Sequence, residues 1–373
     1  MPNRSVLFLV RGGLRIASAF DPPPPAWNAA DIQSILLINT TAVGDTLMTT
    51  PAIRAIRRAF PKARLVSLAS HKAKAVLLHN PHLDQILDHP GRIDLAFLAR
   101  LPRLVMAIRR ERCDLAVILH GNDPDAVLFG YLSGARYRVG WETSQLAFAL
   151  THRLPFDQRG EHLIHRWKRQ LTTLGIAFQG VEMDLPLTDL EEEEADRFLT
   201  QHRIQGRRLV GIHPFANTHS GKVWPMERVT ELGRLLAADG FVPVIIGGPA
   251  EKVPALRMVL ESNHALVSAA GALTLRQSMA LIKRLTVLVT QDSGPSHIAQ
   301  AQGTPVVVLY GPSDPRDTGP LSGPSIIVKK EMACSPCGRS PCHHQVACMV
   351  AIDAHDVRAA VHALADAPVV EGR

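Results

Sequence analysis

The sequence of 373 residues lacks several features that would place it at once in a familiar class. It holds no apolar run near the ~18 residues that span a bilayer, which argues against an integral membrane protein. Five cysteines are too few for a secreted fold held together by disulfides. No G-x-G-x-x-G loop follows the first apolar run, which weakens the case for a dinucleotide-dependent dehydrogenase. Gly221-Lys222 resembles the end of a P-loop, but Val223 replaces the required Ser or Thr and Ala216 replaces the leading Gly.

What is present is a globular composition with an uneven distribution of charge. Hydrophobic residues make up 46% of the chain and charged residues 20%, and the length suits two or three domains. Residues 1–180 carry 23 Lys and Arg against 13 Asp and Glu, whereas residues 181–373 carry 18 against 21. These net charges of +10 and −3 suggest two domains with different ligands, the first ligand being acidic. The alternative is that the arginines are ordinary solvated residues on helix surfaces.

Residues 5–20 form an apolar stretch that Arg11 and Arg15 interrupt. A signal peptide has its basic residues before the apolar core, so this pattern better fits a short basic amphipathic segment that lies on an anionic membrane surface. A helix packed on the protein, or a frayed end, is the alternative. The prolines of residues 22–25 then act as a stiff spacer, because proline fixes φ and cannot extend a helix.

Beyond the spacer, short apolar runs alternate with helical patterns. Apolar runs bounded by turn residues are typical of buried parallel strands, and their alternation with helices predicts doubly wound α/β domains. We expect strands at 34–39, 64–69, 114–119, 209–213, 242–246, 287–290 and 305–309. We expect helices at 46–60, 224–238, 254–261, 275–284 and 296–302, and a capped, acid-rich helix start at 187–194.

The alternating pattern breaks near residue 185 and then restarts, so we expect four parts. These are a basic N-terminal extension with its spacer at 1–33, a first Rossmann-like domain at 34–186, a second at 187–352, and a C-terminal helix and tail at 353–373. We find no internal repeat with a period of about 20–50 residues.

The loop at 40–45 follows the first expected strand, where ligands bind in doubly wound folds. Gly44 permits close approach of a substrate to the backbone. Asp45 would then point into the cleft, where its carboxylate can act as a general base on a sugar hydroxyl. Spacing alone favours the simpler interpretation, that Asp45 caps the following helix.

Two later loops place polar residues at strand–helix junctions. Lys222 precedes an expected helix, where its ammonium and the free helix N–H groups can hold a diphosphate; a surface lysine is the alternative. The next such loop leads into a helix whose first turn offers unpaired N–H groups to an anion. Its polar residues and glycine are Asp292, Ser293, Gly294 and His297. His297 can donate to a phosphate or pack as a core histidine.

Four segments together resemble glycosyltransferase family 9, the lipopolysaccharide heptosyltransferases. They read VGDTLMTTPAIRAIRRAFP at 43–61, GIHPFANTHSGKVWP at 211–225, GGPAE at 247–251, and TQDSGPSHIAQAQGTPVVVLYGPSDP at 290–315. Their order and spacing resemble those of the family and span most of the chain. The resemblance implies the glycosyltransferase-B fold, an α/β architecture of two facing Rossmann-like domains with a cleft between them. It also implies an acceptor in the first domain, an ADP-sugar in the second, and metal-independent catalysis that inverts the anomeric centre.

The resemblance also assigns roles to residues by position. Asp45 matches the general base, and Lys222 matches the lysine that binds the diphosphate and serves catalysis. In the donor site, Thr218 matches a small hydroxyl residue near the phosphates and Glu251 a ribose contact. The residues expected to bind the donor are Thr218, Lys222, Glu251, Asp292, Ser293, Gly294 and His297. The family commonly has Thr where this chain has Ser293, which keeps the hydroxyl.

These matches imply transfer of a sugar, expected to be heptose, from an ADP-sugar donor to a lipopolysaccharide-core-type acceptor. The basic first domain would face an anionic glycolipid, and neither a catalytic cofactor nor a nucleic-acid partner is expected. The protein is expected in the cytoplasm, with peripheral contact at the inner membrane as a further expectation. Two alternatives stay open: a nucleotide-sugar epimerase on the same fold and a non-catalytic nucleotide-binding assembly protein.

Four of the five cysteines fall within 15 residues, at Cys334, Cys337, Cys342 and Cys348. A C-x2-C pair followed by two further cysteines predicts a tetrahedral structural site for zinc or iron. Free thiols and disulfides are the alternatives, and His343 and His344 are alternative ligands. Cys113 stands alone before an expected strand and is interpreted as a packing residue.

Overall fold

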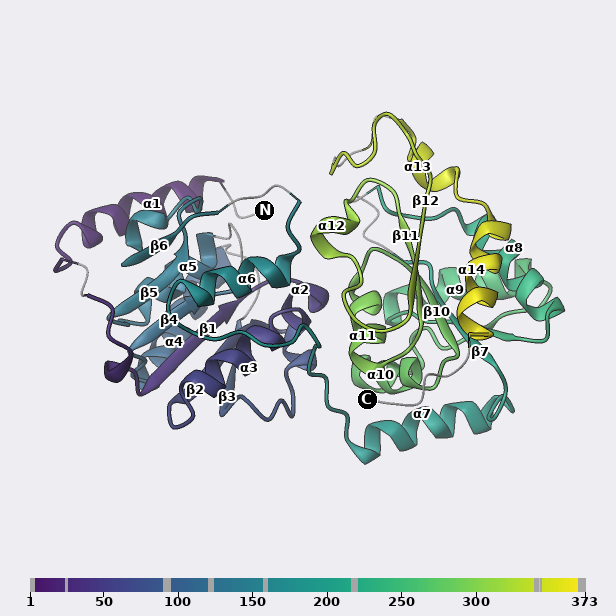
Figure 1. The fold of residues 1–373 in the computed structure, drawn as a ribbon, viewed down its shortest axis with the longest axis horizontal. Coiled ribbons are helices and arrows are strands. Elements are labelled where there is room, and N and C mark those ends of the chain that lie inside the picture. The colour runs from purple at the N-terminus through teal and green to yellow at the C-terminus, as the bar shows by residue number, and fades with distance from the viewer. Residues whose placement is uncertain are drawn as a thin grey trace. The chain divides into compact units, whose positions relative to one another are not determined.

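A computed structural model divides the chain into two compact units, Met1–Asp184 (unit 1) and Leu185–Arg373 (unit 2). It describes residues 4–23, 26–89, 95–119, 124–156, 160–215, 221–338, 342 and 344–367. Each unit contains one six-stranded sheet flanked by helices (Figure 1). In the part of the chain described, no helix is both long and apolar enough to cross a bilayer.

Unit 1 begins with α1 (Arg4–Ser18), which precedes the sheet. The strands are β1 (Ser34–Asn39), β2 (Arg64–Ser70), β3 (Gln85–His89), β4 (Leu115–Ile118), β5 (Tyr137–Trp141) and β6 (His152–Leu154). The remaining helices are α2 (Val43–Leu47), α3 (Thr50–Ala59), α4 (Leu95–Arg110), α5 (Pro124–Leu132) and α6 (Leu163–Thr172). Short 3-10 turns lie at η1 (Ala29–Asp31), η2 (Ala73–Val76) and η3 (Ala147–Ala149).

Unit 2 begins with α7 (Asp189–Gln201), whose predicted cap is a capping box between Thr188 and Glu191. The strands are β7 (Leu209–His213), β8 (Val242–Ile245), β9 (Val267–Ser268), β10 (Val287–Gln291), β11 (Val306–Tyr310) and β12 (Ser325–Lys329). The helices that follow α7 are α8 (Met226–Ala238), η5 (Pro249–Glu251), α9 (Lys252–Glu261), α10 (Leu275–Lys283), α11 (Gly294–Gln302), α12 (Pro315–Thr318), α13 (Ala347–Val350) and α14 (Ala354–Ala365).

Both sheets follow the same strand order. The order is β3-β2-β1-β4-β5-β6 in unit 1 and β9-β8-β7-β10-β11-β12 in unit 2, and every pairing is parallel. Counted within each unit, this is the order of the doubly wound Rossmann sheet. The direction of winding reverses between β1 and β4 and between β7 and β10. In such sheets, ligands bind beyond the carboxyl ends of the strands at this switch point.

The central strands β1, β4 and β10 are buried along their whole length, as parallel strands with helices on both faces should be. β1 is buried at all six positions. On one face of the sheet of unit 1, Ile38 of β1 belongs to a core cluster with Leu104 of α4 and Leu14 of α1. Cys113 lies buried in the same cluster, so its interpretation as a packing residue agrees with the structure. The N-terminal segment is therefore a helix with one face packed on unit 1.

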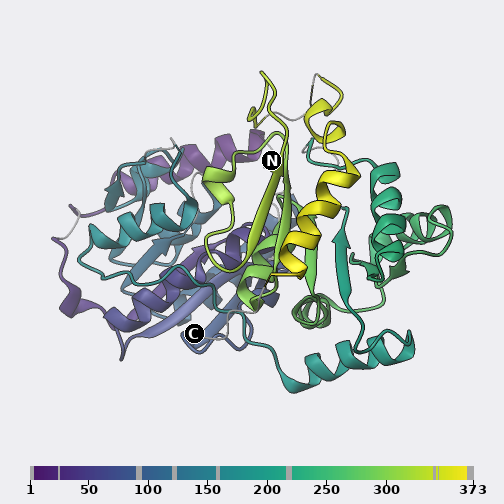
Figure 2. The ribbon, with the colours of Figure 1, turned by 45° about the vertical axis from the view of Figure 1, so that its right-hand side comes forward.

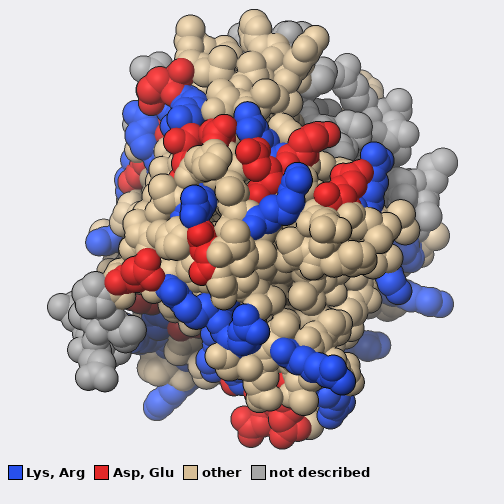
Figure 3. All heavy atoms as spheres, turned by 90° about the vertical axis from the view of Figure 1, so that its right-hand side faces the viewer, with Lys and Arg blue, Asp and Glu red and all other residues tan. Residues whose placement is uncertain are grey.

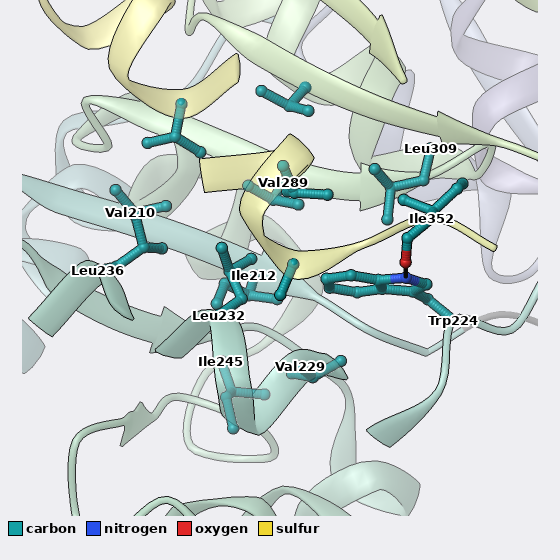
Figure 4. Packing of buried hydrophobic residues seen from close by; sticks show 14 of the residues in the cluster. Val210, Ile212, Trp224, Val229, Leu232, Leu236, Ile245, Val289, Leu309 and Ile352 are labelled. Carbon is teal, nitrogen blue, oxygen red and sulfur yellow. Dashed lines mark hydrogen bonds between the residues drawn. The ribbon is translucent and has the colours of Figure 1, made fainter. Parts of the chain in front are cut away.

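Trp224 completes the core of unit 2 (Figure 4). Its ring is fully buried, and its Nε1–H donates to the carbonyl of Ile352 at 3.1 Å. Ile352 and Val357 belong to the same hydrophobic cluster as Trp224. Figures 1 and 2 show α14 (yellow) beside the sheet of unit 2, where it contacts α8 and β12. α14 is thus part of unit 2.

Figure 3 shows a face of the molecule on which basic and acidic side chains are interleaved with uncharged ones. Several of the charges of unit 2 are paired between elements. Arg228 of α8 contacts Asp353 at 3.2 Å, and Lys330 contacts Asp356 of α14 at 2.8 Å. These pairs connect the start of α14 to α8 and to the chain after β12.

The helix expected at 46–60 is in fact two helices, α2 and α3. Pro51 lies in the first turn of α3, a position that proline favours. The hydroxyls of Thr49 and Thr50 donate to the carbonyls of Thr46 and Leu47, at 2.7 and 2.9 Å, around the break. Side-chain bonds of this kind compete with the helical ladder, so the chain turns between the two helices.

Candidate active site

The residues singled out by sequence follow the strands at the two switch points. In unit 1, Asp45 lies shortly after β1. In unit 2, the loop after β7 leads to Lys222, and Asp292 directly follows β10. Because β7 pairs with β10, with His213 opposite Thr290, these two loops leave neighbouring strands at the same edge. The sheet topology therefore brings Lys222 and Asp292 together.

Lys222 forms an ion pair with Asp292 in unit 2. Its Nζ lies 2.5 Å from Asp292 Oδ2 and donates a second bond to the Asp292 carbonyl at 3.3 Å. Asp292 is 7% exposed, whereas the Lys222 side chain is 29% exposed. An ammonium has three donors, so these two bonds leave one N–H for a ligand. These two bonds hold the lysine ammonium against Asp292, directly before α11.

The carboxylate of Asp292 is buried but well supplied with donors. Thr318 Oγ1 donates to Asp292 Oδ1 at 3.0 Å, and the Tyr310 hydroxyl donates to the same oxygen at 3.4 Å. Burial by itself would raise the pKa of Asp292, but the neighbouring charge and hydrogen bond of Lys222 outweigh it, and the pKa lies below its ordinary value. Burial and the charge of Asp292 raise the pKa of Tyr310, which therefore keeps its proton.

The N-terminus of α11 lies next to this ion pair in sequence. Ser293 is the N-cap residue but makes no capping hydrogen bond, because its hydroxyl donates instead to the Gln291 carbonyl at 3.1 Å. Gly294 opens the helix and Pro295 occupies its first turn. His297 is buried, 4% exposed, within α11. A first turn without a side-chain cap leaves its N–H groups available to an anion.

A pocket of about 240 Å³ lies beside the start of α11. It is mostly apolar and is lined by His213, Ile246, Gly247, Gly248, Pro249, Leu273, Thr274, Leu275, Ser278, Met279, Ile282, Pro295 and Ile298. Burial lowers the pKa of His213 to about 4, so its ring is neutral at physiological pH. A Cβ on Gly247 would come within 2.8 Å of the Phe215 ring, so glycine is needed for this close approach. The pocket suits a flat apolar group with a few polar contacts.

Glu251 and Thr218 were both expected to contact the donor, but the structure describes only Glu251. Glu251 accepts a hydrogen bond from the N–H of Gly248, so its carboxylate fixes the turn at the rim of the pocket. Thr218 lies outside the described residues. Gly221 adopts a φ of +67°, a left-handed conformation suited to glycine, immediately before Lys222.

Asp45 is the third residue of α2 and is not its cap. The N-cap position is occupied by Ala42, which offers no side-chain hydrogen bond. Asp45 is half-buried, and among the described residues its carboxylate forms no hydrogen bond or ion pair. The capping interpretation is therefore wrong, and the carboxylate is left available to a ligand.

Asn39 determines the conformation of the loop that leads to Asp45. Its Oδ1 accepts hydrogen bonds from the N–H of Thr41, at 3.0 Å, and from the Thr41 hydroxyl. Its Nδ2 donates to the Leu119 carbonyl at 3.1 Å, which connects β1 to the end of β4. Sequence reasoning missed Asn39, although a polar residue at the end of an apolar strand is a usable signal. It also missed Tyr310 and Thr318, whose contact with Asp292 has no signature in sequence spacing.

The four clustered cysteines line one pocket of about 360 Å³, together with His344. All are free thiols, and burial, reinforced by the three neighbouring thiols, raises the pKa of Cys348. Within the described part of the chain, no three His, Cys, Asp or Glu side chains are placed to hold a metal ion. The predicted zinc or iron site at Cys334, Cys337, Cys342 and Cys348 is therefore not supported.

The sequence and the fold are both similar to those of known proteins over most of the chain. A sequence model of glycosyltransferase family 9 (heptosyltransferase) matches residues 101–347. The chain is 26% identical to lipopolysaccharide heptosyltransferase 2 of Escherichia coli (strain K12) over 309 residues, which cover 80% of this chain and 88% of that protein. Its structure is similar to the glycosyl transferase family 9 protein from Veillonella parvula DSM 2008, with a TM-score of 0.75, 22% identity, and coverage of 89% and 97% of the two chains.

A second solved structure, that of E. coli ADP-heptose lps heptosyltransferase II, gives a TM-score of 0.73 at 22% identity and covers 89% of this chain and 98% of that one. At these identities, the likeness concerns the fold, and it confirms the expected glycosyltransferase-B class with two parallel α/β sheets. The family match extends over more than half of the sequence. The chain belongs to glycosyltransferase family 9, the heptosyltransferase family, and is a glycosyltransferase.

Proposed function

We propose that this enzyme transfers heptose from ADP-heptose to a sugar hydroxyl of a lipopolysaccharide core. Unit 2 would bind the donor and unit 1 the acceptor. The observation that carries the proposal is the Lys222–Asp292 pair at the switch point of unit 2, beside the uncapped start of α11 and the 240 Å³ pocket. The names of the family 9 relatives supply the sugar and the acceptor class.

The donor side follows from the shape and charge of unit 2. The apolar pocket with neutral His213 takes the adenine, which has a flat, uncharged ring. The remaining N–H of Lys222 and the first-turn N–H groups from Gly294 onward bind the diphosphate. His297 of α11, which interacts electrostatically with Asp292, supports this anion site. Glu251 holds the turn at the pocket rim, and through it positions the ribose.

The acceptor side rests on Asp45. Its carboxylate is half-buried and accepts no hydrogen bond among the described residues, so it can accept a proton from an incoming hydroxyl. Its loop is held by Asn39, which limits the motion of the base. The net charge of +10 on residues 1–180 suits an acceptor that carries phosphates and acidic sugars.

In the proposed step, Asp45 removes the proton from the acceptor hydroxyl as its oxygen attacks the anomeric carbon of the donor. The bond from that carbon to the β-phosphate oxygen breaks, and ADP leaves with the electron pair. Negative charge thus develops on the diphosphate, where Lys222 and the start of α11 stabilise it. Attack opposite to the leaving group inverts the anomeric centre.

Lys222→Gln tests the donor site. We expect the affinity for ADP, measured by calorimetry, to fall roughly 10- to 100-fold, as for loss of one charge-assisted hydrogen bond. Lys330→Gln is the matched control. Lys330 forms an ion pair with Asp356 at 2.8 Å and does not line the pocket, so this variant should bind ADP normally.

Lys222→Gln leaves the buried Asp292 without its partner, so the fold itself must be checked. The double variant Lys222→Gln with Asp292→Asn removes both charges, and its melting temperature should be closer to that of the wild type. If the double variant melts normally and still binds ADP as tightly as the wild type, Lys222 does not bind the diphosphate.

A further inference from the structure

The outer face of α1 carries large apolar side chains that nothing in unit 1 covers. Phe8 is 76% exposed, Ile16 68% and Phe20 84%. Phe8 and Ile16 lie eight residues apart, and the chain continues in helix-like turns after Ser18, with the N–H of Phe20 donating to the Ala17 carbonyl at 3.2 Å. Ile16 lies about 80° around the helix from Phe8, and Phe20 follows in the turn after α1. The three exposed side chains form one broad apolar surface, here called the ridge.

The orientation of this ridge is fixed by the opposite side of α1. Leu14 is 6% exposed and lies in the core of unit 1, with Val10 packed against the same cluster. Just after the helix, Asp21 forms an ion pair with Arg138 at 2.8 Å and accepts a hydrogen bond from the Tyr131 hydroxyl at 3.0 Å. Figure 1 shows α1 (purple) lying along unit 1. The helix is therefore held in place with its ridge facing outward.

Positive charge accompanies the ridge. Arg11 and Arg15 are exposed on α1, and α1 contains no acidic residue. Among the described residues, neither arginine forms an ion pair. Arg109, also without an ion pair in the described part of the chain, lies in an open pocket of about 720 Å³ with Asp21 at the end of the helix. The surface is thus apolar and cationic at once, which is the pattern of helices that lie in a membrane interface.

A second exposed ridge on the molecule has a weaker charge pattern, because Lys252 is its one cation outside an ion pair in the described part of the chain. Val253, Leu256 and Leu260 of α9 are 77%, 48% and 66% exposed and also share one face of their helix. There, however, Arg257 is neutralised by Glu261 at 2.6 Å. Exposed apolar area alone therefore does not distinguish α1, whereas the uncompensated arginines beside it do.

We propose that the outer face of α1 binds the surface of an anionic phospholipid bilayer. Phe8, Ile16 and Phe20 would enter the interface between headgroups and acyl chains, and Arg11 and Arg15 would contact the phosphates. A second copy of the chain fits less well, because a two-fold contact would set the same unpaired arginines against each other. The inference is independent of the donor and acceptor proposed above.

Flotation of the full chain with lipid vesicles tests this proposal. At low salt, we expect the protein to float with vesicles that contain phosphatidylglycerol and much less with vesicles of phosphatidylcholine alone. The combined variant Phe8→Ser, Ile16→Ser and Phe20→Ser should lose binding to both. Arg11→Gln with Arg15→Gln should weaken binding to phosphatidylglycerol vesicles by about fivefold for each arginine.

Val253→Ser with Leu260→Ser is the matched control, since it removes equally exposed apolar side chains from α9, and it should float like the wild type. All these positions are exposed, so melting temperatures should not change. Wild-type flotation by the triple variant of α1 would overturn the proposal. A second result would also overturn it: the wild type forms a dimer in sedimentation equilibrium, the triple variant does not, and neither binds vesicles. The ridge would then bind a second copy of the chain. Neither result requires ADP or transfer, so neither depends on the proposed reaction.

Discussion

At the scale of the residue, two aspartates that each follow a strand at a switch point differ in their surroundings. Asp292 follows β10, is buried, and is saturated by Lys222, Thr318 and Tyr310. Asp45 follows β1 and is half-buried, with no partner for its carboxylate among the described residues. A carboxylate that is fully hydrogen-bonded positions its neighbours, whereas one that is free can take a proton. This contrast favours Asp45 over Asp292 as the base.

Asp45→Asn is the corresponding test. Asparagine has nearly the same size but cannot accept the proton, so we expect kcat for sugar transfer to fall by roughly 10²- to 10⁴-fold. The affinity for ADP should stay at the wild-type value, because Asp45 belongs to unit 1 and the proposed donor site to unit 2. Steady-state kinetics and calorimetry measure the two quantities separately.

Asp88→Asn provides the control for the Asp45 variant, since Asp88 is a carboxylate of unit 1 that is engaged with His71 at 2.7 Å. It should transfer sugar at the normal rate. A rate for Asp45→Asn within about threefold of the wild type would exclude Asp45 as the general base, because such a group contributes at least about 10²-fold.

At the scale of the element, α7 is attached to α10 by a partly buried ion pair. Arg276 donates through Nε and Nη2 to the two oxygens of Glu191, at 2.7 and 2.6 Å. The same carboxylate accepts the N–H of Thr188 at 2.9 Å and so caps α7. The hydrogen bonds from Arg276 lower the pKa of Glu191 to about 2. Because this value lies below that of the unfolded chain, the pair stabilises the fold at neutral pH and ceases to do so as pH falls from about 4.5 to about 2.

Glu191→Gln should therefore lower the free energy of unfolding by about 1–2 kcal/mol at pH 7 and by much less near pH 2, because glutamine keeps the cap but not the charge. Urea denaturation at both pH values measures this difference. Glu193→Gln, at an exposed neighbouring position, should change neither value. An equal loss for Glu191→Gln at both pH values would mean that packing, not charge, is responsible.

The accuracy with which a helix or strand can be predicted depends on its length, because a short element shows too few residues of its pattern. The apolar runs of β1 and β7 and the periodic segment of α8 were predicted at or near their observed bounds, and the start of α7 was predicted from its cap. β9 has only two residues and β6 three, too few for any period to be recognised. The break before α3 was signalled by Pro51, but the apolar period across 46–60 concealed it. The spacing of the cysteines revealed their common pocket but not the directions of their sulfurs.

At the scale of the whole molecule, the two units are separate Rossmann sheets, and each has a core of its own. The clusters share no residue: one is built from residues up to 150, the other from residues after 209. Sequence reasoning predicted two such domains because the alternation of strands and helices restarts after residue 185. It could not predict the exact site geometry, because the bonds to Asp292 come from Lys222, Thr318 and Tyr310, which are distant in sequence.

Separate cores predict that ADP stabilises the units unequally. ADP at about 100 times its Kd should increase the free energy of unfolding of unit 2 by about 2.7 kcal/mol. In calorimetry, the melting temperature of unit 2 should therefore rise, and that of unit 1 should not change. Hydrogen exchange identifies which segments gain protection, and these should lie after residue 185. Lys222→Gln with Asp292→Asn should reduce the effect at the same ADP concentration, because its Kd is expected to be higher. Equal protection of both units would show that ADP binding is not confined to unit 2.

The bond between Trp224 and Ile352 bears on the order in which the protein is made. Translation completes unit 1 early, and every residue of its core is available before unit 2 is begun. Unit 2 differs, because its central tryptophan waits for a partner that leaves the ribosome more than a hundred residues later. During that interval the incomplete unit 2 exposes apolar surface that Ile352 and α14 cover in the finished chain. The nascent chain is therefore most vulnerable to aggregation late in its synthesis, when the first unit has already folded.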